Sequence, residues 1–215
     1  MGKRGDGFSF MTGKFITLEG SEGSGKSTQA GLILDYLKSK KVPVMLLREP
    51  GGVKISENIR KLLLDVHNTG MGDECETLLY MAARAQMVKE ILEPQLKAGK
   101  VILCDRFLDS TIAYQGYGNG IEIKIIEQLG LFATKGFVPD LTILFDIHPE
   151  KGLSRAGDKK DRIESRPLEY HNRVRNGYLD LSKQYPARIK VIKVDAAKDE
   201  IFKRVKPYIN ALLDL

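Results

Sequence analysis

Short apolar stretches alternate along the chain with longer segments in which apolar residues recur every three or four positions. The short stretches are rich in β-branched and large apolar side chains. Several are almost continuously apolar, as expected of strands covered on both faces of a parallel sheet. They predict five buried strands: Phe15–Glu19, Pro43–Leu47, Val101–Asp105, Leu141–Asp146 and Lys190–Val194.

The intervening segments have the period of amphipathic helices, as Ile33, Tyr36 and Leu37 show after the first strand. Further helices are expected at Ile55–Leu63, Asp73–Lys97, Ile121–Lys135, Leu168–Gln184 and Ala197–Leu213. Strands that alternate with helices form βαβ units, whose right-handed crossovers place helices on both faces of one sheet. The pattern therefore predicts an α/β fold, a doubly wound domain with a five-stranded, mainly parallel sheet flanked by helices.

The composition narrows the class of protein. The 215 residues are 42% hydrophobic and 29% charged, which suits a packed core and argues against intrinsic disorder. No stretch approaches about 18 uncharged apolar residues, so a transmembrane helix is excluded. The two cysteines, Cys75 and Cys104, are too few for a disulfide scaffold and fit a reducing compartment, so we expect a cytoplasmic protein. Residues 14–215 are expected to form one domain after a Gly-rich N-terminal extension, residues 1–13.

The strongest chemical signal follows the first predicted strand. Gly20–Ser27 reads GSEGSGKS and satisfies the pattern G-x-x-x-x-G-K-S at the start of an amphipathic helix. Glycines let successive N–H groups face a phosphate, Lys26 can reach the β/γ oxygens, and the Ser27 hydroxyl can join a Mg²⁺ shell. A Gly-rich turn with a solvated lysine is the alternative. The residues expected to bind a nucleoside triphosphate are Gly20, Ser21, Glu22, Gly23, Ser24, Gly25, Lys26, Ser27 and Thr28.

Two further polar clusters follow predicted strands, at the sheet edge where ligands gather in such folds. Arg48 precedes a Pro-Gly-Gly turn and is placed to bind a second anion, although a surface arginine beside a turn explains it too. Asp105 ends the third strand and can hold Mg²⁺ or its water, and Arg106 can stabilise phosphoryl charge. An ion pair at the strand end is the alternative for Asp105 and Arg106.

The formal charge of +6 is compatible with nucleic acid, an anionic membrane surface or a small polyanion such as a nucleotide. No aromatic and basic stripe on which bases could stack is present, so we expect neither a nucleic-acid nor a membrane partner. The segment from Arg155 to Arg175 contains seven basic and four acidic residues. About half of the net charge therefore lies in this one segment.

The order of these motifs is similar to that of the thymidylate kinase family. The resemblance is carried by REPGG at residues 48–52, YMAAR at 80–84, DRF at 105–107, Ser110-Thr111 and AYQG at 113–116, and it extends from about Lys14 to the C-terminus. It implies Mg²⁺-dependent transfer of the γ-phosphoryl group of ATP to dTMP, giving dTDP and ADP in dTTP biosynthesis. It also implies a homodimer that pairs through long helices.

The resemblance assigns roles around the acceptor. Arg48 would bind the phosphate of the monophosphate, and Glu22 would lie near the 3′-hydroxyl of its sugar. Tyr114 would lie against C2′ of the sugar and disfavour a ribose hydroxyl. Tyr80 and Arg84, four apart on one helix face, would stack on thymine and hydrogen-bond its edge.

Tyr80 stands where the family usually has Phe, and core packing is the alternative for its ring. The remaining expected substrate-binding residues are Arg106, Ser110, Thr111 and Gln115.

Residues from about 155 to 166 resemble the lid that closes over ATP in this family. Gly157 and Asp158 interrupt any helix there, which predicts a mobile loop. Family members without an arginine inside the P-loop neutralise the transferring phosphoryl group with lid arginines, which makes Arg155 and Arg162 the candidates. A solvated charged loop is the alternative. The expected catalytic residues are Lys26, Arg106, Arg155, Arg162 and Glu22.

Three other functions stay open at this point. A kinase for another nucleotide or for a bare deoxynucleoside is one, although Arg48 as a phosphate ligand argues against the nucleoside. A regulatory P-loop switch would bind nucleotide and signal to a partner, without stimulation by any monophosphate. A nucleic-acid-binding protein would show salt-sensitive binding to DNA.

Overall fold

A parallel sheet forms the centre of the computed structural model, which describes residues 13–155 and 161–215. Its strands are β1 (Lys14–Glu19), β2 (Val44–Arg48), β3 (Val101–Asp105), β4 (Leu141–Asp146) and β5 (Ile189–Lys193). They lie in the order β2-β3-β1-β4-β5, and every neighbouring pair is parallel. The predicted fold class and all five strands are confirmed, with bounds shifted by one residue at β1, β2 and β5.

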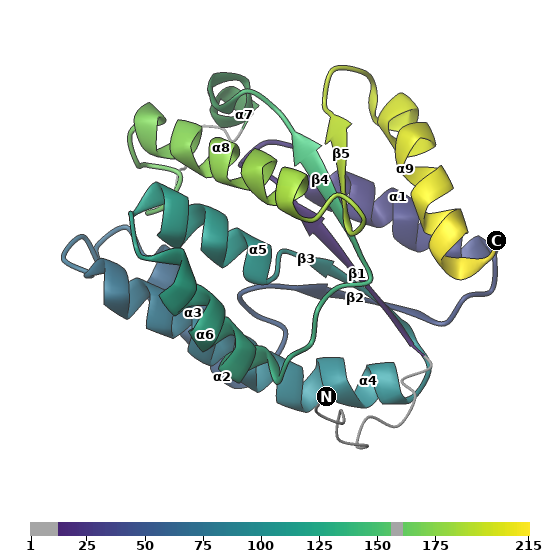
Figure 1. Ribbon diagram of the computed structural model, residues 1–215, viewed down its shortest axis with the longest axis horizontal. Helices are drawn as coiled ribbons and strands as arrows, with labels where there is room; N and C mark the ends of the chain where they lie inside the picture. Colours follow the sequence, from purple (N-terminus) through teal and green to yellow (C-terminus); the bar gives the residue numbers. More distant parts are fainter. Residues whose placement is uncertain (1–12, 156–160) are drawn as a thin grey trace, which may run out of the picture.

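Helices cover both faces of the sheet (Figure 1). One face carries α1 (Lys26–Ser39) and α9 (Lys198–Leu213), and the other carries α2 (Lys54–Leu64), α3 (Asp73–Met87), α6 (Ile123–Thr134) and α8 (Leu168–Gln184). Helical structure continues beyond α3 through a π-helical turn, η1 (Val88–Leu92), into α4 (Glu93–Lys97), so the predicted helix Asp73–Lys97 is one helical path. The predicted helix Leu168–Gln184 matches α8 at both ends.

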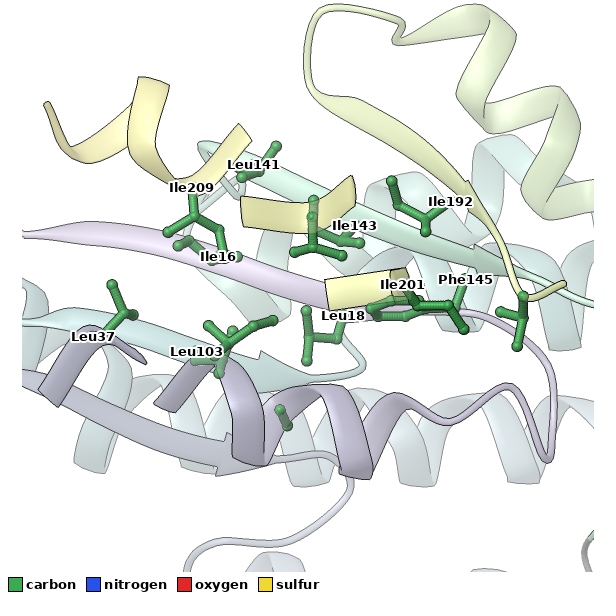
Figure 2. Packing of buried hydrophobic residues seen from close by; sticks show 14 of the residues in the cluster. Ile16, Leu18, Leu37, Leu103, Leu141, Ile143, Phe145, Ile192, Ile201 and Ile209 are labelled. Carbon is green, nitrogen blue, oxygen red and sulfur yellow. The ribbon is translucent and has the colours of Figure 1, made fainter. Parts of the chain in front are cut away.

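The apolar runs of the strands form hydrophobic cores on both faces of the sheet. Ile16, Leu18, Leu103, Ile143 and Phe145 point toward α1 and α9, where they meet side chains such as Ile201 and Ile209 (Figure 2). Alternating residues of the same strands, such as Phe15 and Ile102, pack on the other face against Met87 and Leu92. Because successive side chains of a strand point to opposite faces, a sheet covered on both faces needs nearly continuous apolarity.

Two helical segments do not follow from the apolar pattern. The first comprises α5 (Leu108–Thr111) and the π-helical segment η2 (Ile112–Gly118), and the second is the short helix α7 (Pro149–Arg155). Most of η2 is buried, and it packs closely on α8: a Cβ at Gly118 would lie 2.5 Å from the Tyr170 ring. A segment buried on most sides has no amphipathic period, which is why the pattern does not reveal it.

No helix in the described ranges is long and apolar enough to cross a membrane. Residues 1–12 of the predicted N-terminal extension lie outside the described residues, as do Gly157 and Asp158 of the predicted lid loop.

Substitution of Leu103 tests the assignment of the core. Leu103 is fully buried on β3, so Leu103→Ala should lower the free energy of unfolding by about 2–5 kcal/mol. Ile55 on α2 is 51% exposed, and Ile55→Ala should change stability by no more than about 0.5 kcal/mol. Urea unfolding of both variants compares them directly, and equal losses would contradict the assignment.

Candidate active site

A cavity of about 350 Å³ opens where β1, β2 and β3 end. This is the expected place for a ligand in a doubly wound sheet. Most of the residues predicted for the site line it: Glu22, Gly23, Lys26, Ser27, Arg48, Tyr80, Arg84, Asp105, Arg106, Ser110, Thr111, Tyr114 and Gln115. Arg155 and Arg162 do not line it, and neither do Gly20, Ser21, Ser24, Gly25 and Thr28.

The loop between β1 and α1 is shaped by glycines. Gly25 has a φ of 82°, a left-handed conformation that favours glycine, directly before α1 begins at Lys26. A Cβ at Gly23 would lie 2.0 Å from the carbonyl oxygen of Gly152, and a Cβ at Gly152 would lie 2.3 Å from that of Glu22. Helix α7 therefore packs backbone to backbone against the predicted phosphate loop.

Lys26 lies over this loop. Its Nζ donates to the carbonyl oxygens of Gly20 at 2.9 Å and Ser21 at 3.0 Å, and to Ser24 Oγ at 3.3 Å. Burial, assisted by the nearby positive charge of Arg106, lowers the pKa of Lys26 to about 8. An anionic phosphate beside the ammonium group would favour its charged form, so this site is electrostatically suited to an anion.

Ser27 and Asp105 supply oxygen ligands at one point of the cavity wall. Ser27 Oγ donates to Asp105 Oδ2 at 3.3 Å, and Asp105 Oδ1 is buried without a hydrogen-bond partner among the described residues. Hydroxyl and carboxylate oxygens are the donors that Mg²⁺ prefers, usually completed by water and substrate phosphates. Since the described residues form no cluster of three or more His, Cys, Asp or Glu side chains, such an ion would depend on those other ligands.

Arg106 is held at the centre of the site. Its backbone has a φ of 73°, which is uncommon for a residue with a side chain, directly after β3. Its guanidinium donates to Glu22 Oε1 at 3.0 Å, to the Tyr114 hydroxyl at 3.1 Å and to the Tyr178 hydroxyl at 3.2 Å. It also lies over the Tyr114 ring, 4.9 Å from the centroid.

Glu22 is an ionised acceptor. Its Oε1 also accepts from the Tyr114 hydroxyl at 2.5 Å, and its Oε2 lies 3.5 Å from His171 Nδ1. Burial alone would raise the pKa of Glu22, but His171, Arg106 and Lys26 outweigh it and lower the pKa to about 2. The carboxylate therefore keeps its charge at neutral pH.

Glu19, the last residue of β1, lies beneath this group and is fully buried. It accepts from the Phe107 backbone N–H at 2.7 Å, from Ser110 Oγ at 2.6 Å and from the Tyr178 hydroxyl at 3.0 Å. Burial, followed by the nearby charge of Asp109, raises the pKa of Glu19 to about 7. The hydroxyl of Ser110 thus belongs to the support of the Arg106 turn.

Arg84 faces the cavity from a buried position. Its Nε donates to Glu49 Oε2 at 2.8 Å, its Nη1 to Thr111 Oγ1 at 2.9 Å and its Nη2 to the Phe107 carbonyl at 2.9 Å. The guanidinium is only 2% exposed. Tyr80, one turn earlier on α3, lines the same cavity, and burial raises the pKa of its hydroxyl, which stays protonated at neutral pH.

Arg48, in contrast to the buried Arg84, is exposed to solvent. Its side chain is 54% exposed, and its Nη2 donates to both carboxylate oxygens of Glu57, at 2.9 and 3.2 Å. Exposed pairs of this kind contribute about 0–1 kcal/mol. Arg48 can therefore exchange Glu57 for another anion at little cost.

The two predicted lid arginines lie at different ends of the site. Arg155 is the last residue of α7, and its Nη1 donates to the Gly23 carbonyl in the phosphate loop at 3.3 Å. Arg162 instead donates to Glu76 Oε2 at 2.5 Å and to the Leu63 carbonyl at 2.8 Å.

Other arginines of the segment from Arg155 to Arg175 also have partners within the protein. Arg166 pairs with Glu76, Arg173 donates to the Gly118 carbonyl and Arg175 pairs with Asp146.

Sequence reasoning did not identify several residues of the site. Glu19, Glu76 and His171 contact predicted residues without being predicted themselves. Glu76 was detectable, since it precedes Tyr80 and Arg84 at successive four-residue helical steps. His171 lies on α8, far from any motif, and no local pattern marks it.

Comparison with known proteins identifies relatives that span the whole fold. The sequence model of a family described as thymidylate kinase matches residues 18–205. The thymidylate kinase of Symbiobacterium thermophilum is 44% identical over 200 residues, covering 93% of this chain and 94% of that protein. The thymidylate kinase of an Exiguobacterium strain is 46% identical over 188 residues, covering 86% and 88%. The crystal structure of thymidylate kinase from Ehrlichia chaffeensis superposes with a TM-score of 0.77 at 33% identity, covering 92% of this chain and 98% of that one. The chain belongs to the thymidylate kinase family.

Proposed function

We propose that this protein transfers the γ-phosphoryl group of ATP to dTMP, giving dTDP and ADP, as a step toward dTTP. Membership in the thymidylate kinase family supports this reaction. The main supporting observation is a single cavity with the phosphate loop at one end. At the other end lie Arg48, whose ion pair with Glu57 is exposed and exchangeable, the ring of Tyr80, and the buried guanidinium of Arg84.

The triphosphate binds at the phosphate loop. Lys26 and the N-terminus of α1 supply positive charge to the β- and γ-phosphates. Ser27 and Asp105 fit a Mg²⁺ ion, which when bound neutralises charge on the phosphate oxygens. Arg155 contacts the loop at Gly23, whereas Arg162 is held by Glu76, so Arg155 is the favoured lid arginine.

The acceptor occupies the other end. Arg48 releases Glu57 and binds the phosphate of dTMP, while Tyr80 stacks on the base and Arg84 donates to its edge. Glu22, ionised because its pKa is about 2, accepts from the 3′-hydroxyl of the sugar.

The reaction itself requires little proton chemistry. A phosphate monoester is largely anionic at neutral pH, so no general base is required. Catalysis consists of positioning the two phosphates in line and stabilising the charge of a loose transition state, to which Lys26, Arg106 and a lid arginine contribute.

A homodimer is the second part of the proposal. Helices α3 and α6 pack together and leave large apolar side chains exposed, including Leu78, Leu131 and Phe132, the last 85% exposed. Exposed apolar surface of this kind is typical of an interface. The cytoplasmic location expected from the cysteines stays a prediction, and both cysteines are free.

The substrate preference tests the proposed reaction. With ATP in a coupled assay, dTMP should be used in preference to UMP, CMP and AMP. Lys26→Ala should lower kcat about 100-fold or more while the fold is retained, because a preorganised donor to the reacting phosphates is lost. Slow ATP hydrolysis that no monophosphate stimulates would instead support a nucleotide switch.

Tyr114→Phe tests the sugar contact. The variant keeps the ring, which packs edge-on against Tyr170 and Tyr178, but loses the hydroxyl that donates to Glu22. Turnover of dTMP should persist, and the preference for dUMP over UMP in kcat/KM should fall about tenfold, the scale of one hydrogen bond. Tyr117→Phe, in the same helical segment but outside the cavity lining, is the matched control. Unchanged discrimination in Tyr114→Phe would remove Tyr114 from this role.

Phe132→Lys tests the dimer. A charge at this exposed apolar position should shift the protein toward monomer in analytical ultracentrifugation, because its desolvation opposes association. Tyr208→Lys, on α9 at the opposite face of the sheet, should leave the oligomeric state unchanged. A monomeric wild type would refute the proposed dimer.

A further inference from the structure

A fully buried carboxylate lies just outside the cavity. Glu76, on α3, is 0% exposed, does not line the cavity, and has hydrogen-bond partners on both oxygens. No step of the proposed reaction uses it. Burying a charge this completely is unfavourable unless it is paired, so its four partners indicate what it holds in place.

One oxygen holds the segment that lines the acceptor end. Glu76 Oε1 accepts from Gln115 Nε2 at 2.9 Å and from Asn119 Nδ2 at 3.2 Å. Gln115 lines the cavity from η2, and Asn119 is the residue that follows η2. Glu76 therefore orients the amide group of Gln115 from outside the cavity.

The other oxygen is held by two arginines. Glu76 Oε2 accepts from Arg162 Nη2 at 2.5 Å and from Arg166 Nη2 at 2.7 Å. Arg166 is itself fixed by stacking over the Tyr170 ring, 4.5 Å from the centroid, and by a bond to Asn119 Oδ1. These two guanidinium groups offer only donors, so they require an acceptor at position 76.

The orientation of Gln115 has a chemical consequence. An ionised carboxylate accepts hydrogen bonds and donates none, so only the NH₂ group of Gln115 can face Glu76. The carbonyl oxygen, Oε1, then lies on the side of the amide away from Glu76 and is the only acceptor that the side chain can offer to the cavity. Gln115 consequently presents an acceptor, and a ligand there must bring a donor.

We infer that Glu76 fixes Gln115 as a hydrogen-bond acceptor toward the base and thereby contributes to the choice of a pyrimidine with a ring N–H over cytosine. Thymine and uracil have N–H at N3, whereas cytosine has a lone pair there. With cytosine bound, the carbonyl oxygen of Gln115 would face the lone pair at N3 and would have no donor. Burying a polar atom without a hydrogen-bond partner costs free energy, so cytosine is disfavoured. This inference rests on the proposed use of dTMP, and in it Glu76 acts as a positioning residue.

Glu76→Gln keeps the volume of the side chain but replaces one acceptor oxygen with an NH₂ donor. The carbonyl of the new amide faces the two arginines, and its NH₂ group faces Gln115 and Asn119. The Asn119 carbonyl is held by Arg166, so Asn119 loses its bond to position 76, whereas the amide of Gln115 can turn to accept. Gln115 then presents its own NH₂ group to the cavity, which suits N3 of cytosine. The preference for dTMP over dCMP in kcat/KM should fall about tenfold. The ratio for dTMP over dUMP should stay unchanged, because both bases have N–H at N3.

Two controls separate this role from a loss of stability. Asp109→Asn removes the charge of another buried carboxylate, one that pairs with Arg188 outside the cavity, and should lower stability without changing the dTMP to dCMP ratio. Gln115→Ala should lower that ratio by itself, and adding Glu76→Gln to it should cause no further fall. The single variant Gln115→Ala applies even where Glu76→Gln does not fold.

The outcomes are distinguishable. An unchanged dTMP to dCMP ratio in folded Glu76→Gln, or in Gln115→Ala, would overturn the inference while leaving the kinase reaction intact. A uniform loss of activity on all monophosphates would also overturn it, because a merely structural role predicts that result. A wild-type enzyme that does not phosphorylate dTMP would refute the proposed function instead.

Discussion

The active site depends on one buried interaction, the contact of Glu19 with the turn that follows β3. Glu19 ends the central strand β1, and its carboxylate accepts from the Phe107 N–H and from the hydroxyls of Ser110 and Tyr178. These bonds hold Arg106 in a left-handed conformation that a side chain ordinarily disfavours. The same carboxylate thus links the strand that carries the phosphate loop, the turn that carries the central arginine, and helix α8. Loss of that link would misplace Arg106 without altering any residue that contacts a ligand.

Around this support, three arginines of the cavity, Arg48, Arg84 and Arg106, are each paired with a carboxylate. Solvent exposure separates the fixed pairs from the exchangeable ones. Arg84 and Glu49 are 2% and 4% exposed, so separating them would leave a buried charge unpaired. Arg48 and Glu57 are 54% and 38% exposed, and water compensates either partner when the pair opens. A guanidinium that must keep a constant direction toward a base suits the first environment. One that must receive and release a phosphate suits the second.

The strands, the sheet class and the phosphate loop could be predicted from the sequence, because apolar runs and a glycine loop are local signals. Tyr80 and Arg84 were predicted from the resemblance to thymidylate kinases, and both line the cavity. The segment Leu108–Gly118 was not predicted as a helix, since burial on most sides removes the amphipathic period. Glu76 and His171 were missed for a different reason. Their importance comes from partners far apart in the chain, which only the tertiary fold brings together.

The sequence likewise does not show which charged side chains are already paired within the fold. The segment from Arg155 to Arg175 is basic in sequence, yet Arg162, Arg166 and Arg175 are paired with carboxylates. Charge density along the chain therefore does not measure the charge available to a ligand. The clearest indication of an anion site is instead Lys26. Burial and the adjacent Arg106 lower the pKa of its ammonium group to about 8. A phosphate placed beside Lys26 would offset both effects, because its negative charge favours the charged form of the lysine.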